Sequence, residues 1–141
     1  ARHYEENTKR LLIELENFSN KQVERFQTLP LEKKQFISYH ASLVYVADWL
    51  GLESVASIEP KPGLSPNPAH VAKIISLMRE KGIKTIIQES YQARSTSDKI
   101  AKMTNASIVV INNGPQTKGE ETYIAYLQRF CDELYTSLNK H

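Results

Sequence analysis

Four short runs of strand-forming residues alternate with helical patterns along the chain, and this alternation limits the possible folds more than any other feature. The runs occupy residues 35–39, 54–58, 84–88 and 107–111. Apolar residues recur at the spacing of a helix face over residues 41–50, 69–81, 95–104 and about 120–138. Strands that alternate with helices predict a parallel sheet covered on both faces. We therefore predict an α/β fold with a four-stranded parallel sheet in the order 2-1-3-4, which is a doubly wound arrangement.

A longer helical pattern precedes the first strand. It runs from about residue 5 to residue 29 and ends before Pro30, because proline disfavours helix in the residue before it. Such a helix would span about 38 Å, which is long for a domain of this size. Its approximate apolar stripe consists of Leu11, Leu12, Leu15, Phe18 and Phe26.

Composition excludes several classes of protein. The 141 residues carry a formal net charge of +2, and no stripe of Lys and Arg is interleaved with aromatic residues, so we expect no nucleic-acid partner. No stretch is apolar enough to span a bilayer. The single cysteine, Cys131, excludes an internal disulfide framework and a multi-cysteine zinc site, and we expect it to be buried. Ala1 stands where a start Met would be and leads directly into helix-like sequence, so we expect a piece of a longer chain.

Two chemically capable side chains follow predicted strands. His40 comes directly after the first strand and Glu89 directly after the third. In the predicted strand order both would border the crevice at the carboxyl edge of the sheet, where ligands bind in such folds. His40 is a metal ligand, an acid–base group or a hydrogen-bonded strand cap. Glu89 is a metal ligand, a residue that holds a ligand in place, or an anion that favours the start of a helix.

The remaining candidates point less clearly to chemistry. Asn113 follows the fourth strand in an Asn-Asn-Gly-Pro turn, and an asparagine carbonyl is a poor zinc ligand. His70 lies in the first turn of a predicted helix, where we expect it to be solvated. No phosphate-binding glycine motif, nucleophile elbow or combination of nucleophile, base and oxyanion hole is present, so we expect a binding protein rather than an enzyme.

Several segments together resemble one family, the zinc/manganese-binding solute proteins of bacterial ABC transporters (the cluster A-I group). The resemblance covers nearly the whole chain, and the order and spacing of its segments carry it more than any single motif. The matching segments are YEENTKRLL at residues 4–12, FISYHASLVYVADWLGL at 36–52, GIKTIIQE at 82–89 and ETYIAYL at 121–127.

The resemblance implies that the chain is the C-terminal half of a two-lobed protein. In that family a long rigid helix joins two α/β lobes, and the metal lies between the lobes. Residues 1–29 would be the end of the helix and residues 30–141 the C-terminal lobe. The N-terminal lobe, absent from this sequence, would supply the first two histidines, and His40 matches the third ligand. The family's fourth ligand is often an Asp near the position of Asn113, and its absence argues for zinc rather than manganese. Glu89 would hold a ligand in place.

The implied function is capture of Zn²⁺, with Mn²⁺ as the alternative, and delivery of the ion to an ABC permease in the membrane. The parent protein would be a periplasmic or extracellular lipoprotein. Taken alone, the lobe would bind metal weakly and could self-associate through surface that the missing lobe covers. Two alternatives remain: a self-contained flavodoxin-like domain that binds a small ligand or a partner, and an enzyme that uses His40 as base and Glu89 to orient it.

Overall fold

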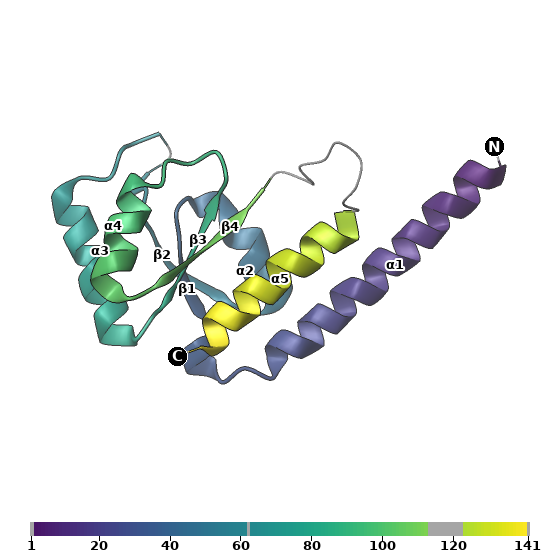
Figure 1. Ribbon diagram of the computed structural model, residues 1–141, viewed down its shortest axis with the longest axis horizontal. Coiled ribbons are helices and arrows are strands. Elements are labelled where there is room, and N and C mark those ends of the chain that lie inside the picture. Colours follow the sequence, from purple (N-terminus) through teal and green to yellow (C-terminus); the bar gives the residue numbers. More distant parts are fainter. Residues whose placement is uncertain (1, 62, 113–122, 141) are drawn as a thin grey trace.

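The computed structural model describes residues 2–61, 63–112 and 123–140, and its elements follow the predicted alternation of strands and helices (Figure 1). Two short 3₁₀ helices, η1 (Leu31–Lys33) and η2 (Ala41–Leu43), accompany the longer elements. The strands are β1 (Gln35–Ser38), β2 (Glu53–Ser57), β3 (Thr85–Glu89) and β4 (Ser107–Ile111). The α-helices are α1 (Arg2–Gln27), α2 (Val44–Leu50), α3 (Pro68–Lys81), α4 (Ser95–Thr104) and α5 (Tyr123–Asn139).

The four strands form one sheet in the order β2-β1-β3-β4, and all three neighbouring pairs are parallel. The predicted fold class and strand order are therefore confirmed. The last residue of β1, Ser38, pairs with the last residue of β2, Ser57, and with Ile87 of β3, which continues for two more residues to Glu89. The segments that follow β1 and β2 therefore leave the sheet side by side, next to the end of β3.

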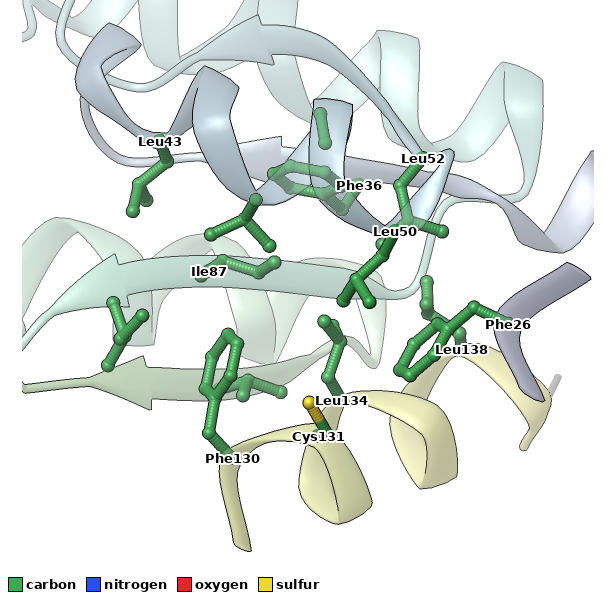
Figure 2. Close-up of a cluster of buried hydrophobic side chains, with 14 of the residues drawn as sticks. Phe26, Phe36, Leu43, Leu50, Leu52, Ile87, Phe130, Cys131, Leu134 and Leu138 are labelled. Atoms are coloured by element: carbon green, nitrogen blue, oxygen red, sulfur yellow. The ribbon is translucent and has the colours of Figure 1, made fainter. Parts of the chain in front are cut away.

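Helices cover both faces of the sheet, and each face has its own hydrophobic core. Helices α1, α2 and α5 pack on one face, where Figure 2 shows Phe26 of α1 near Leu138 of α5 and Phe36 and Ile87 on the strands. Helices α3 and α4 cover the other face, with Ile86 in their core. Adjacent residues Ile86 and Ile87 thus serve opposite cores, as the alternation of side chains along a strand requires.

Local sequence signals fix where the helices begin and end. Asn67 caps α3 by accepting a hydrogen bond from the backbone N–H of His70 (2.8 Å), and Pro68 occupies the first helical position. Gly51 and Gly82 end α2 and α3 in the left-handed conformation, with φ of 67° and 66°. These signals keep the segments between strands and helices short, apart from the proline-rich loop between β2 and α3.

Helix α1 packs on α2 and α5 along its C-terminal half alone. Phe18 and Phe26 are buried, whereas Leu11 and Leu12 of the predicted apolar stripe are 48% and 60% exposed. Figure 1 shows the N-terminal half of α1 projecting beyond α5 and the sheet. The prediction of a long helix is confirmed, and its apolar stripe is buried only in the second half, because residues 5–14 are exposed. Within the described ranges, no helix has the length and apolarity needed to cross a membrane.

Candidate metal centre

Three ionisable side chains lie in equivalent positions at the carboxyl edge of the sheet. Because Ser38, Ser57 and Ile87 are level, His40, Glu59 and Glu89 each lie two residues beyond the aligned position on their own strand. Backbone hydrogen bonds continue past the strand ends, from Ile58 N to Ser38 O (2.9 Å) and from Glu59 N to Tyr39 O (3.0 Å). We call this part of the carboxyl edge, with His40, Glu59 and Glu89, the rim. Backbone hydrogen bonds that extend those of the sheet hold it in place.

Both ring nitrogens of His40 have neighbours. Nδ1 accepts a hydrogen bond from the backbone N–H of Ser42 (3.0 Å), and Nε2 lies 3.5 Å from Oε1 of Glu59. The side chains of His40 and Glu59 are 26% and 13% exposed, so the pair is accessible from one side. Since Nδ1 accepts a hydrogen bond, its lone pair is in use and the neutral ring carries its hydrogen on Nε2, facing the carboxylate.

Glu89 is buried and held by two hydroxyl groups. Oε1 accepts a hydrogen bond from Ser42 Oγ (3.1 Å), and Oε2 accepts one from the Tyr91 hydroxyl (2.5 Å). This hydrogen bond to Glu89 raises the pKa of Tyr91 above its ordinary value. Ser42 therefore lies between His40 and Glu89, binding the first through its backbone and the second through its side chain. An enzyme in which Glu89 orients His40 directly would need a hydrogen bond between the two, and Ser42 takes that place.

Glu59 and Ser42 are the residues that sequence reasoning missed. Glu59 reads as the start of a proline-rich loop and Ser42 as part of a helix, so neither suggested a site. In the structure Glu59 Oε1 also accepts a hydrogen bond from the backbone N–H of Gly63 (2.8 Å), which ties the loop to the rim. The signal that finds Glu59 is the strand register, because Glu59 follows β2 as His40 follows β1.

The other candidates lie away from this pair or outside the described residues. Asn113 falls outside them. The backbone of its neighbour Asn112 is held by the Tyr126 hydroxyl, which receives a hydrogen bond from Asn112 N (2.7 Å) and donates one to Asn112 O (2.5 Å). His70 is not solvated as predicted: its Nε2 lies 2.8 Å from the carbonyl oxygen of Ser57, so it is a hydrogen-bonded packing residue.

The donor atoms at the rim fit part of a metal site. Imidazole nitrogen and carboxylate oxygen both bind zinc, and carboxylates also suit manganese. In the part of the chain that the structure describes, no three His, Cys, Asp or Glu side chains are placed to hold one metal ion. His40 and Glu59 thus offer two candidate donor atoms side by side, which is fewer than a complete metal site has.

Comparison with known proteins shows which family the chain belongs to. The family model described as "Zinc-uptake complex component A periplasmic" matches residues 1–137. The high-affinity zinc uptake system protein ZnuA of Bacillus subtilis (strain 168) is 28% identical over 96% of the chain. The chain corresponds to 44% of that relative's length.

Solved structures agree with the family match. The laminin-binding protein of Streptococcus agalactiae, described as an adhesin with metal-transporting activity, superposes with a TM-score of 0.76 at 26% identity over 96% of this chain and 52% of its own. The manganese-bound periplasmic metal-binding protein of Candidatus Liberibacter asiaticus gives a TM-score of 0.66 at 27% identity over 99% of this chain and 50% of its own. A cadmium-bound structure of that protein matches as well, with a TM-score of 0.66 at 27% identity over 99% of this chain and 51% of its own. The chain, with its 2-1-3-4 sheet and a histidine at the rim, belongs to the family of periplasmic zinc-uptake components of which ZnuA is a member.

Proposed function

We propose that this chain captures a divalent metal ion, zinc in the first instance, at the carboxyl edge of its sheet, with His40 as the principal ligand. The observation that carries the proposal is the position of His40: a partly exposed imidazole held on the rim of the sheet, beside a carboxylate, in a chain of the zinc-uptake family. The role is binding and release of an ion, not catalysis.

The proposed site is half of a complete one. The chain spans about half the length of the relatives it matches, and its described residues offer a pair of donors rather than a full set. We assign residues 1–29 to the end of a helix that connects two lobes and residues 30–141 to the C-terminal lobe. The N-terminal lobe would supply the remaining ligands, and the loaded protein, a periplasmic or extracellular lipoprotein, would dock on an ABC permease.

Zinc is favoured over manganese by the donors that follow the fourth strand. The sequence has Asn112 and Asn113 there rather than an Asp, so no carboxylate directly follows that strand to suit Mn²⁺. The Liberibacter relative has been solved with manganese and with cadmium, so related lobes accept more than one divalent ion. Mn²⁺ therefore remains the alternative cargo.

Capture requires a rearrangement around His40. A neutral imidazole that binds a metal through Nε2 must carry its hydrogen on Nδ1, which now accepts the Ser42 N–H. Binding through Nε2 must therefore break the hydrogen bond from Ser42 N. Acid also opposes capture, because protons compete with the metal for the ring nitrogen.

The test is a zinc titration of the complete protein that contains this chain, before and after His40→Ala. We expect His40→Ala to lower zinc affinity by at least about 100-fold, since losing a ligand should exceed the 10–100-fold typical of outer residues. Lys73→Ala, at an exposed position of α3, is the control and should leave affinity unchanged. Unaltered affinity in a folded His40→Ala protein, judged by circular dichroism, would refute the proposal.

A second measurement uses this chain alone. With a pair of donors it should bind Zn²⁺ weakly, detectable by NMR titration but not as a tight stoichiometric complex. Tight one-to-one uptake by the isolated chain in isothermal titration would contradict the half-site arrangement.

A further inference from the structure

We propose that Glu59 is a direct metal ligand, so that this lobe contributes one nitrogen from His40 and one oxygen from Glu59 to the same ion. The inference rests on the proposed function and deepens it by naming a donor that neither the sequence motifs nor the family match assigns. Glu59 lies on the β2 side of His40, whereas β4, the strand that precedes Asn113 in the sequence, lies beyond β3 on the other side.

The distance between the two donor atoms carries the inference. Zinc ligands lie about 2.0–2.2 Å from the ion, and two ligands at the tetrahedral angle are then about 3.4 Å apart. His40 Nε2 and Glu59 Oε1 are 3.5 Å apart. A good N–H···O hydrogen bond is shorter, at about 2.7–3.2 Å, so the observed spacing suits two ligands of one ion better than a direct hydrogen bond.

The carboxylate is also held in advance of binding. Its backbone continues the sheet ladder through the hydrogen bond to Tyr39 O, and the Gly63 N–H donates to Oε1. Gly63 has φ of 80°, a conformation that glycine adopts without strain and that lets the loop turn its N–H onto the carboxylate. In the described residues no Lys or Arg forms an ion pair with Glu59, and the imidazole of His40 lies beside it.

Glu89, the other carboxylate of the rim, is engaged elsewhere. Each of its oxygens accepts a hydroxyl hydrogen bond, from Ser42 and from Tyr91, and Ser42 separates it from His40. Glu89 therefore positions the segment that carries His40, while Glu59 faces the ring nitrogen that a metal would use. In place of an Asp after the fourth strand, Glu59 supplies the oxygen donor, from the opposite side of His40.

The test compares Glu59→Gln and Glu59→His with the unmodified complete protein by zinc titration. Glutamine keeps an oxygen that can accept the Gly63 N–H but is a poor zinc ligand, so it separates ligation from loop anchoring. We expect Glu59→Gln to weaken zinc binding at least about tenfold and Glu59→His to restore most of the affinity. Glu80→Gln, on an exposed position of α3, is the matched control and should change nothing.

A spectroscopic readout distinguishes a ligand from a residue that only positions His40. With Co²⁺ in place of zinc, Glu59→His should change the visible absorption bands, because a nitrogen replaces an oxygen in the coordination sphere. If Glu59→Gln and Glu59→His both leave affinity and spectrum unchanged while His40→Ala still abolishes tight binding, Glu59 is not a ligand and the proposed function stands. If His40→Ala has no effect either, both proposals fail together.

Discussion

Cys131 and Asp132 are neighbours in α5, yet their surroundings shift their pKa values in opposite directions. Burial raises the pKa of the Cys131 thiol to about 12, because the thiolate would lose its solvation. The hydrogen bond from the Arg25 guanidinium, 2.6 Å from Asp132 Oδ1, lowers the pKa of that carboxyl. Adjacent positions on one helix thus face a core on one side and a charged partner from α1 on the other.

The buried thiol leads to a prediction about reactivity. Cys131 should resist thiol reagents in the folded protein at mildly alkaline pH, since the thiolate is the reactive form and is suppressed here. Labelling with a chromogenic disulfide should become fast only after denaturant is added. Rapid labelling of the folded chain would contradict the buried position.

The ion pair between Arg25 and Asp132 leads to a prediction about acid. Asp132→Asn should lower the free energy of unfolding by no more than about 1 kcal/mol, because the pair is largely exposed. The folded-state pKa lies below the unfolded value, so the contribution is present above the unfolded pKa and is lost as pH falls through the folded one. Urea unfolding at several pH values should show the two proteins converging in acid. A difference that grows in acid would contradict this assignment.

At the level of elements, α1 consists of a packed half and an exposed half. Phe26 is fully buried against the sheet and meets the ring of Tyr135 edge-on at 5.5 Å between centroids. Trp49 of α2 donates a hydrogen bond from its indole nitrogen to Ser19 Oγ (2.8 Å). A self-contained flavodoxin-like domain would be expected to pack its first helix along the whole length. The exposed half instead supports the proposal that α1 is the end of a helix between two lobes.

Substitutions in the two halves of α1 should therefore differ strongly in their effect on stability. Phe26→Ala should reduce the free energy of unfolding by about 3–5 kcal/mol, because it opens a cavity in the core. Leu12→Ala is the matched control on the exposed half and should change it by less than about 0.5 kcal/mol. Equal effects in urea unfolding would mean that the N-terminal half packs on the lobe after all.

The sequence predicted the elements well and the rim only in part, for a specific reason. The alternation of strand and helix patterns predicted the sheet order, and the sheet order predicted the position of His40. Glu59 could not be found this way because β2 contains a bulge: Phe36 pairs with Ser54, but the next residue, Ile37, pairs with Ala56. Without this extra residue Ile58, not Glu59, would lie opposite His40, and a one-residue shift turns a side chain to the other face.

On the scale of the whole molecule, two cores enclose the sheet while one end of α1 lies outside both. The exposed apolar side chains at that end are Leu11, Leu12 and Ile13. Isolated apolar residues on a surface are ordinary, but these three together leave the projecting half of α1 with exposed apolar area that suits association.

We accordingly expect the isolated chain to self-associate as its concentration rises. Replacing Leu12 and Ile13 with glutamine should shift sedimentation-velocity profiles towards the monomer without changing the circular dichroism spectrum, because neither side chain belongs to a core. Replacing Leu64, which is exposed in the proline-rich loop, with glutamine is the control and should have no such effect. A chain that stays monomeric at every concentration would show that the patch is too small to drive association.

The attachment of α1 has a mechanical consequence. With a rise of 1.5 Å per residue, the 26-residue helix is about 39 Å long, and its contacts with the lobe begin only near Phe18. Because the helix is stiff and packed only at its C-terminal half, a small rotation of the packed half produces a much larger displacement of its N-terminal end. The bond from Trp49 to Ser19 lies near the start of the packed half. That hydrogen bond therefore helps to fix the angle at which the projecting half of α1 leaves the rest of the structure.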